Sequence, residues 1–238
     1  MSLVLSNERI GKDLYLMKTM KSERGGAARM GQFYMLRAWG NYPVLSRPIS
    51  VFDEDGQTVS FLYKVAGKGT GIFSALQKGD EISMLGPLGN SFPDAKGKIA
   101  LIGGGVGIAP FYLAAKQLKE QNSSCADLYL GFSEEAVLIE EYKRLADNLI
   151  VNVGGFISDE IDPDGYDHIM ACGPEPMMRA LYEKCKDSLA EERLYVSMER
   201  RMACGVGACL VCNCKTRYGN KKVCMDGPVF KGVEVFGI

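Results

Sequence analysis

The sequence predicts a mixed fold in three parts: an antiparallel β-barrel, an α/β module built on a parallel sheet, and a small cysteine-rich C-terminal segment. Short β-prone runs, separated by links that carry glycine or proline, fill roughly the first 95 residues. From Lys98 onward, apolar runs alternate with stretches of helical spacing. Five of the eight cysteines then crowd into the last 35 residues.

The first part, residues 1–96, contains runs that favour strands at residues 32–38, 48–52, 59–66 and 80–86. A short helix over residues 71–77 follows the flexible turn GKGTG. Short strands joined by such links predict a small antiparallel barrel.

The second part, residues 97–197, alternates between short apolar runs and stretches in which apolar residues have helical spacing. Helices are expected at residues 110–121 and 176–189. Apolar runs predict strands at residues 98–104, 127–132, 149–155, 168–173 and 193–199. This alternation predicts a parallel sheet with helices on both faces.

The composition excludes several classes of partner. Lysine plus arginine number 28 and aspartate plus glutamate number 29, so no positive field exists to bind nucleic acid or an anionic membrane. No apolar run approaches the length of a membrane span, and the N-terminal residues lack the pattern of a secretory leader. The sequence therefore predicts a soluble, cytoplasmic protein.

The third part, residues 198–238, carries the strongest motif. Cys204, Cys209, Cys212 and Cys224 have the C-x4-C-x2-C…C spacing of plant-type 2Fe-2S clusters. The glycines in ACGVGAC allow backbone N–H groups to approach the sulfurs. A structural zinc site is the alternative, but it more often uses two separated C-x2-C pairs. Cys214 lies outside this spacing and is interpreted as a bystander.

A flavin motif is proposed in the barrel. Arg47–Ser50 begins an expected strand, where the arginine can bind a phosphate and the serine hydroxyl can meet a polar flavin edge. Gly69–Gly71 would place amide groups at a pyrophosphate. The four residues taken alone are a weak signal and more often form an ordinary turn. No role is assigned to the segment from Trp39 to Pro43.

A dinucleotide motif joins the first strand of the α/β module to its first helix. Its residues are Gly103, Gly104, Gly105, Gly107 and Pro110. It departs from G-x-G-x-x-G, yet its glycines let a dinucleotide approach a helix N-terminus, and Pro110 suits a first helical turn.

Three further side chains of the α/β module bear on the coenzyme or the chemistry. Glu134 and Glu135 follow the second strand and would repel a 2′-phosphate, which favours NAD over NADP, although acidic residues also simply favour a helix start. His168, the single histidine, lies in an apolar strand pattern and is interpreted as structural.

Taken together, the order of these motifs resembles the ferredoxin reductase-like flavoprotein superfamily over residues 1–200. The resemblance implies that Cys172, Gly173 and Pro174 lie in a hydride-transfer pocket beside the nicotinamide and flavin rings. It also implies a set of residues that face FAD: Arg47, Pro48, Ile49, Ser50, Leu62, Tyr63, Lys64, Gly69 and Thr70.

With the C-terminal cysteines added, the whole chain resembles the electron-transfer subunits of class 1B dihydroorotate dehydrogenases. That resemblance implies an FMN-containing catalytic subunit as partner, in a heterotetramer with two copies of each. Electrons from dihydroorotate would pass through the 2Fe-2S cluster and FAD to NAD. Val206, Ala208 and Leu210 are expected at or near the interface, where exposed apolar groups would be covered.

Other functions remain open at this point. A small subunit of a ferredoxin:NAD(P) reductase or a sulfide dehydrogenase would share the scaffold and differ only in its partner. A non-enzymatic redox sensor needs neither the flavin motif nor the nicotinamide motif, so their presence argues against it.

Overall fold

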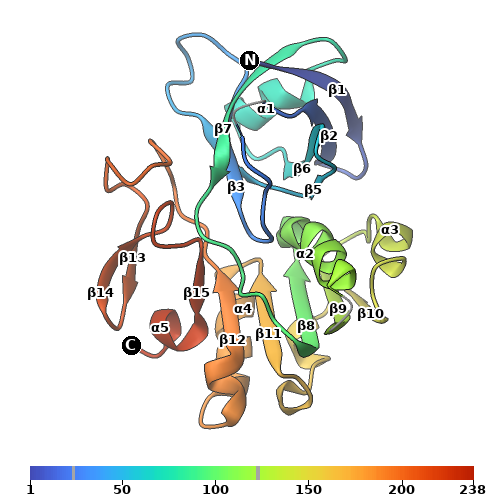
Figure 1. Ribbon diagram of the computed structural model, residues 1–238, viewed down its shortest axis with the longest axis vertical. Helices are drawn as coiled ribbons and strands as arrows, with labels where there is room; N and C mark the ends of the chain where they lie inside the picture. Colours follow the sequence, from blue (N-terminus) through green and yellow to red (C-terminus); the bar gives the residue numbers. More distant parts are fainter. Residues whose placement is uncertain (23–24, 122–123) are drawn as a thin grey trace.

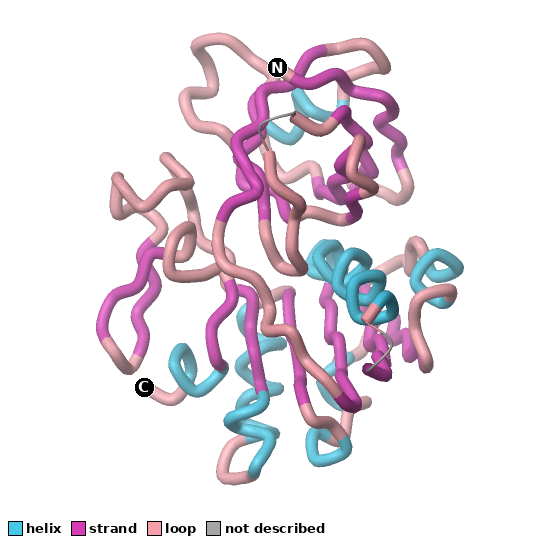
Figure 2. Tube along the Cα trace, viewed as in Figure 1, coloured by secondary structure: helices cyan, strands magenta, loops and turns pink. Residues whose placement is uncertain are grey.

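The computed structural model describes residues 1–22, 25–121 and 124–238, which form two sheets and a small hairpin (Figures 1 and 2). The first sheet has seven antiparallel strands in the order β4-β3-β7-β1-β2-β6-β5 and curls into a barrel at the top of Figure 1. Its core contains Val4, Met17, Phe61 and Phe73. Its elements are β1 (Ser2–Arg9), β2 (Leu14–Met20), β3 (Phe33–Arg37), β4 (Arg47–Ser50), β5 (Asp53–Glu54), β6 (Thr58–Lys64), α1 (Lys68–Ser74) and β7 (Glu81–Leu88).

The second sheet has the order β10-β9-β8-β11-β12-β15. Its strands are β8 (Gly97–Gly104), β9 (Ser124–Phe132), β10 (Asn148–Val153), β11 (His168–Cys172), β12 (Leu194–Ser197) and β15 (Val229–Lys231). All neighbouring pairs run parallel except β12 and β15.

Helices cover both faces of this sheet because successive strand residues point to opposite sides. On one face, Leu101 of β8 packs in the same core as α2 (Ala109–Glu120). On the other face, the next residue, Ile102, packs in the core that contains α4 (Glu175–Cys185).

Short elements complete the α/β module. They are η1 (Gly105–Ile108), α3 (Ile139–Lys143), η2 (Ile157–Asp159), η3 (Pro163–Gly165) and η4 (Leu189–Arg193).

The C-terminal segment leaves the second sheet and then returns to it. After β12 the chain forms the cysteine loops and a hairpin of β13 (Asn213–Thr216) and β14 (Gly219–Lys222). It then adds β15 to the edge of the sheet, where Phe230 pairs with Val196, and ends in α5 (Gly232–Phe236). The segment beyond residue 197 is therefore built into the sheet of the α/β module.

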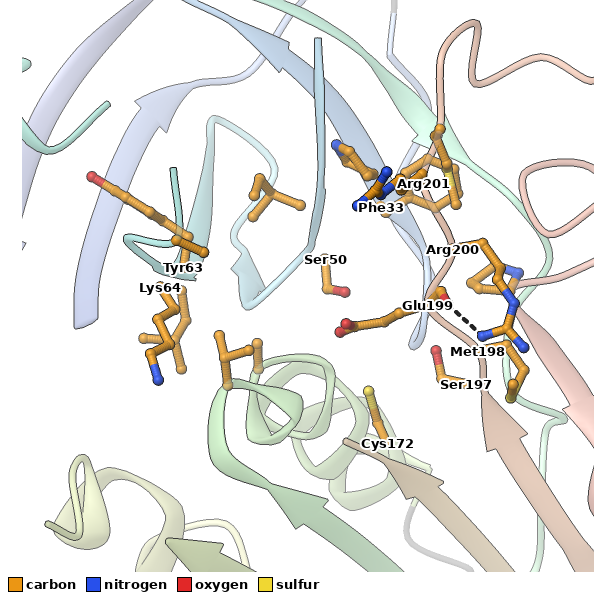
Figure 3. A pocket seen from close by; sticks show the side chains of 18 residues that line it. Phe33, Ser50, Tyr63, Lys64, Cys172, Ser197, Met198, Glu199, Arg200 and Arg201 are labelled. Carbon is orange, nitrogen blue, oxygen red and sulfur yellow. Dashed lines mark hydrogen bonds between the residues drawn. The ribbon is translucent and has the colours of Figure 1, made fainter. Parts of the chain in front are cut away.

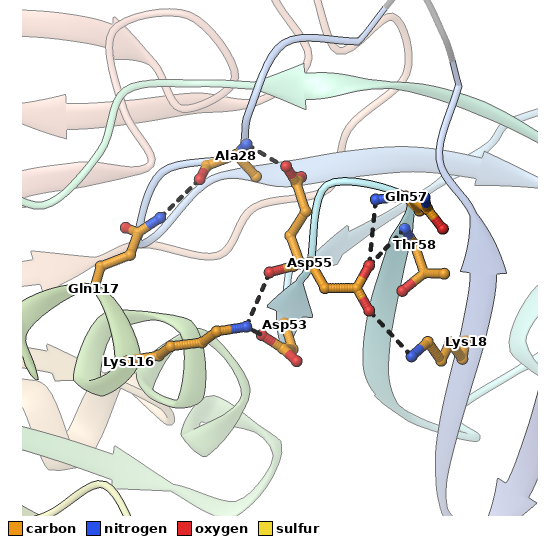
Figure 4. Close-up of polar contacts among 9 residues, drawn as sticks. Lys18, Ala28, Asp53, Asp55, Gln57, Thr58, Lys116 and Gln117 are labelled. Carbon is orange, nitrogen blue, oxygen red and sulfur yellow. Dashed lines mark hydrogen bonds and ion pairs between the residues drawn. The ribbon is translucent and has the colours of Figure 1, made fainter. Parts of the chain in front are cut away.

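Helix α2 ties the barrel to the α/β module (Figure 4). Lys116 Nζ lies 2.6 Å from Asp53 Oδ1 and donates to the Glu54 carbonyl oxygen at 3.0 Å. Gln117 Nε2 donates to the Ala28 carbonyl oxygen at 2.9 Å. These bonds hold the C-terminal half of α2 against β5 and the segment that precedes β3.

The expected fold class is confirmed: an antiparallel sheet precedes a parallel sheet with helices on both faces. Each expected strand has an observed counterpart, whereas six observed strands were not foreseen: β1, β2, β5, β13, β14 and β15. The helix expected at residues 71–77 begins three residues earlier, at Lys68. Among the described residues, none of the helices combines the length and apolar character that crossing a membrane requires.

Candidate functional site

A cavity of about 540 Å³ lies where all three parts of the chain meet (Figure 3). Strands β4 and β6 supply the barrel side, and Val106, Ala109 and Cys172 supply the α/β side. The chain that leaves β12, residues 197–202, closes the third side together with Pro228. The cavity is lined by most of the residues expected to face FAD: Pro48, Ile49, Ser50, Leu62, Tyr63 and Lys64.

Three polar side chains point into this cavity from different elements. Figure 3 shows Ser50 from β4, Cys172 from the end of β11 and Glu199 from just after β12 around the same space. Burial raises the pKa of the Cys172 thiol to about 12, and the nearby Glu199 carboxylate contributes to the rise. Cys172 is therefore a neutral thiol at physiological pH and not an activated nucleophile.

Glu199 is a residue that the sequence analysis missed. Its carboxyl keeps access to solvent through the cavity, yet the surrounding protein raises its pKa by lost solvation. A titratable group with a raised pKa in a cavity is typical of a functional site. No motif marks Glu199, and its position directly after the last parallel strand was the only available signal.

A second cavity, of about 700 Å³, opens at the carboxyl ends of the parallel strands. It is lined by Gly104, Gly105, Gly107, Gly173 and Pro174, as expected for a dinucleotide site. Lys64 and Glu199 line both cavities, so the two spaces adjoin. Ligands bind at this edge of open α/β sheets because the loops that follow the strands gather there.

The glycine turn and the turn after β11 pack backbone against backbone. A Cβ atom at Gly107 would meet the Cys172 carbonyl oxygen and lie 2.5 Å from Gly173 Cα. Gly103 and Pro110, which were also assigned to the coenzyme, do not line the cavity. A Cβ at Gly103 would lie 2.8 Å from Ile108 Cα, and Pro110 is buried in the first turn of α2.

The two acidic residues proposed to select NAD do not line this cavity themselves. Glu134 and Glu135 border an adjoining recess beside the β1–β2 turn, which shares Gly105 and Ser133 with the cavity. Glu134 forms an ion pair with Lys12 at 3.1 Å.

Besides Glu199, the acidic residue that lines the dinucleotide cavity is Asp159, beside the exposed ring of Phe156. Asp159 follows strand β10, whereas Glu134 and Glu135 follow strand β9, so both positions are candidates for the charge that selects NAD.

Arg47, Gly69 and Thr70 lie outside the lining of the first cavity. The Arg47 guanidinium rests on Gly69, where a Cβ atom would lie 2.7 Å from its Nε. The Thr70 hydroxyl is used within its own turn: it accepts from the Ala66 N–H at 2.9 Å and donates to the Gly67 carbonyl oxygen at 3.1 Å. Thr70 therefore stabilises the backbone of its own turn through its hydroxyl group.

The cysteine loop places backbone N–H groups on its sulfurs. The Val206 N–H donates to Cys204 Sγ at 3.4 Å, and the Gly207 N–H donates to Cys224 Sγ at 3.2 Å. Gly205 and Gly207 have φ values of +75° and +79°, which glycine adopts without strain. Backbone N–H groups lower the pKa of the Cys204 thiol to about 6, with that of Val206 as the largest cause and that of Cys209 next.

The four expected cluster cysteines form two neighbouring pairs. The side chain of Cys209 lies close enough to lower the pKa of Cys204, and the Cys224 N–H donates to Cys212 Sγ at 3.4 Å. Burial raises the pKa of Cys224 to about 12, and the neighbouring Cys212 thiol adds to the rise. Among the described residues, no three histidine, cysteine or acidic side chains converge as a site for one metal ion would require.

Cys214 is separate from these pairs. It lies on β13, and its thiol donates to the Lys215 carbonyl oxygen at 3.7 Å. Arg200 lies beside it and forms an ion pair with Glu175 at 3.0 Å. The structure thus places Cys214 in the packing between the C-terminal segment and α4, and its bystander role stays a prediction.

His168 lies far from this chemistry. It is the first residue of β11, whereas the cavities open beyond Cys172 at the other end of that strand. Its ring lies 6.3 Å from that of Tyr195, and its Nδ1 is buried. This position fits the structural role expected of it.

The C-terminal segment matches a family model described as the iron-sulfur cluster binding domain of dihydroorotate dehydrogenase B, over residues 199–236. A solved structure of the NADH-dependent reduced ferredoxin-NADP oxidoreductase is similar over the whole fold. It has a TM-score of 0.88 and 29% sequence identity and covers 99% of this chain and 89% of that one. The fold and the C-terminal domain confirm the expected cofactor classes: an iron–sulfur cluster, a flavin and NAD.

Two relatives identify the family. The dihydroorotate dehydrogenase B (NAD(+)) electron transfer subunit of Clostridium acetobutylicum is 44% identical over 216 residues, which cover 87% of this chain and 86% of that protein. The subunit of the same name from Caldanaerobacter subterraneus subsp. tengcongensis is 37% identical and covers 98% of this chain and 96% of its own length. The chain therefore belongs to the family of dihydroorotate dehydrogenase B electron transfer subunits.

Proposed function

We propose that this chain carries electrons between NAD and a separate FMN-containing catalytic subunit that oxidises dihydroorotate to orotate. The observation that carries the proposal is the succession of three adjoining sites. Gly205 of the cysteine loop packs on Met35 of the barrel, and Met202 lines the first cavity. Lys64 and Glu199 then line both that cavity and the dinucleotide cavity.

The first cavity suits a flavin ring. Its walls are mainly apolar, and Ser50 supplies a hydroxyl at the centre (Figure 3). Arg47 rests on Gly69 nearby and supplies a positive charge for phosphate. When bound there, FAD would exchange a hydride with the nicotinamide and single electrons with the cluster. The flavin is needed because the nicotinamide transfers two electrons at once and the cluster one at a time.

The second cavity suits NAD. Gly104, Gly105 and Gly107 present a surface without side chains to the coenzyme's phosphates. Glu199 lies where the two cavities adjoin, so its carboxylate favours the cationic nicotinamide of NAD⁺ over the neutral ring of NADH. Asp159 lines the cavity beside Phe156, where a carboxylate would repel the 2′-phosphate of NADP.

The cysteine loop suits a 2Fe-2S cluster. Each iron of such a cluster takes two thiolates, and the neighbouring side chains Cys204 with Cys209 and Cys212 with Cys224 could supply one pair to each iron. The N–H groups of Val206 and Gly207 stabilise negative charge on the sulfurs. These four cysteines are the proposed ligands, and Cys214 is not among them.

The partner is proposed to cover the cysteine loop. Cys209, Ala208 and Val206 are exposed there, as are the apolar side chains of Leu210 and Met225, at 67% and 62%. Exposed apolar groups beside a redox centre are typical of a protein interface. We propose an assembly of two copies of this chain and two FMN-containing subunits.

The proposal is tested by reconstitution. The chain alone should oxidise NADH with an artificial acceptor such as ferricyanide and should leave dihydroorotate unchanged. Adding the FMN-containing subunit should start NAD-dependent oxidation of dihydroorotate. Oxidation of dihydroorotate by the isolated chain, or none by the complex, would contradict the proposal.

Assembly is tested with a pair of charge substitutions. Leu210→Glu should weaken binding to the catalytic subunit and leave NADH oxidation by ferricyanide unchanged. Leu189→Glu is the matched control, because Leu189 is 76% exposed in η4, within the α/β module. Normal assembly of Leu210→Glu, measured by analytical ultracentrifugation, would place the interface elsewhere.

A second candidate function is electron transfer with ferredoxin. It is favoured by the similarity to the ferredoxin-NADP oxidoreductase, which extends over 99% of this chain. Reduced ferredoxin supplied to the chain in place of the catalytic subunit should then yield NADH. Turnover with ferredoxin and none with dihydroorotate would favour this candidate.

A further inference from the structure

The loop between β3 and β4, residues 38–46, carries the single tryptophan of the chain, Trp39. The loop lies over α1: Lys68 Nζ is 3.9 Å from the centre of the Tyr42 ring, and the Trp39 and Phe73 rings are 5.3 Å apart. Trp39 therefore packs against α1, next to the turn at Gly69 that is assigned to the flavin pyrophosphate.

Trp39 is packed against two guanidinium groups. The Cζ atoms of Arg47 and Arg37 lie 5.4 Å and 5.9 Å from the centre of its ring. Arg37 also holds the loop backbone, because it donates to the carbonyl oxygens of Trp39, Gly40 and Val44. Arg37 thus holds the loop that carries the indole, and the Arg47 side chain stacks on the indole ring.

The Trp39 ring and the Arg47 guanidinium both lie against Gly69. A Cβ atom at Gly69 would lie 2.7 Å from Arg47 Nε and 2.9 Å from Trp39 Cη2. Any larger residue at position 69 would push these side chains away from the turn. The absence of a side chain brings Arg47 and Trp39 together at the turn assigned to the flavin pyrophosphate.

The indole N–H has no use within this packing. Trp39 Nε1 is buried and, among residues 1–22, 25–121 and 124–238, has no hydrogen-bond acceptor. Burying a donor without an acceptor is unfavourable, and a neighbouring guanidinium has only donors to offer. An N–H beside an arginine instead suits an anionic or hydroxyl oxygen, such as those of a phosphate or a ribose.

We propose that Trp39 is a binding residue for the ADP half of FAD. Its ring holds Arg47 against Gly69, and its Nε1–H donates a hydrogen bond to a phosphate or ribose oxygen of the cofactor. The inference rests on the proposed function, because it takes FAD as the flavin of this chain.

The first test observes the indole N–H itself. Because the chain has one tryptophan, a ¹H–¹⁵N spectrum of the protein contains one indole signal. FAD is removed from the purified chain and restored stepwise, and the signal should move downfield as FAD binds. Riboflavin, which has the ring and no phosphate, should leave the signal close to its starting position. No movement with FAD, or equal movement with both, would overturn the proposal.

The second test measures affinity. Trp39→Phe keeps an aromatic ring and loses the donor, so the dissociation constant for FAD should rise roughly tenfold, the effect expected of one hydrogen bond to a charged acceptor. The dissociation constant for riboflavin should stay the same. Tyr42→Phe is the matched control, since it removes a polar group from the same loop at a side chain that is 66% exposed. It should bind FAD like the unmodified chain.

The outcomes separate this inference from the proposed function. A chain that takes up no FAD at all defeats the proposed function. A chain that binds FAD while Trp39→Phe retains full affinity, or loses affinity for FAD and riboflavin equally, defeats the role of Trp39 alone. The spectroscopic test uses the unmodified chain, so it decides the question even if Trp39→Phe does not fold.

Discussion

Gly107→Ala probes the contact on which the dinucleotide site depends. The added Cβ would lie 2.5 Å from Gly173 Cα and would also meet the Cys172 carbonyl oxygen. Non-bonded carbon atoms prefer about 3.5–4 Å, so the two turns must separate by about 1 Å. Both neighbours are backbone atoms, which cannot swing aside as a flexible side chain could.

The cost follows from this geometry. Overpacking of this kind costs about 1–3 kcal/mol of unfolding free energy. In a chain of this size each kcal/mol lowers the melting temperature by about 2–4 °C, so we expect a decrease of roughly 5 °C. The separation also moves Gly173 and Pro174, which line the cavity. The KM for NADH should therefore rise at least about tenfold, because misplacement of about 1 Å is costly at a binding site.

Thermal unfolding and NADH-dependent reduction of ferricyanide measure the two effects. The control is Gly165→Ala in η3, where an added Cβ meets no atom within 4 Å. It should change neither quantity. If Gly107→Ala binds NADH normally and melts at the unmodified temperature, the two turns are not in the packed contact described above.

Three further predictions concern the redox sites. Glu199→Gln should weaken NAD⁺ binding roughly tenfold relative to NADH at pH 8, since a carboxylate attracts the cationic ring. Because the pKa of Glu199 is raised, this difference should fade on acidification at a higher pH than for an ordinary glutamate; a pH-independent ratio would contradict it. Asp159→Asn should improve kcat/KM for NADPH relative to NADH, whereas Glu134→Gln should not. The reverse pattern would assign the repulsion of the 2′-phosphate to Glu134. Cys209→Ser should lose iron and labile sulfide but keep FAD and NADH oxidation, while Cys214→Ser should keep the cluster; iron analysis showing the opposite would reassign the ligands.

The sequence was most informative where the chemistry is local. Cys204, Cys209 and Cys212 lie within one loop, so their spacing alone restricts which sulfurs can meet. The alternation of apolar runs and helical spacing after Lys98 likewise predicts the parallel sheet, because each period is set within a few residues. The C-terminal match over residues 199–236 agrees with the first of these predictions.

The first two strands show where local pattern is weak. In β1 only Ser2 and Val4 are buried, and most residues of β2 are only half-buried. Such strands lack a clear alternation of apolar and polar residues. Their pairing with each other and with β6 and β7 supplies the structure that the pattern does not indicate.

Only the tertiary structure decided which residues share a cavity. Glu199 meets Ser50 and Cys172 because the chain leaving β12 passes the open side of the barrel, although these residues are far apart in sequence. Glu134, which is expected near the coenzyme, forms an ion pair with Lys12 of the barrel, a contact that no local pattern indicates. The return of β15 to the sheet likewise depends on pairing with a strand that ends more than 30 residues earlier. Short-range patterns record backbone preference and burial, whereas contacts between distant segments arise only when the sheets have formed and packed together.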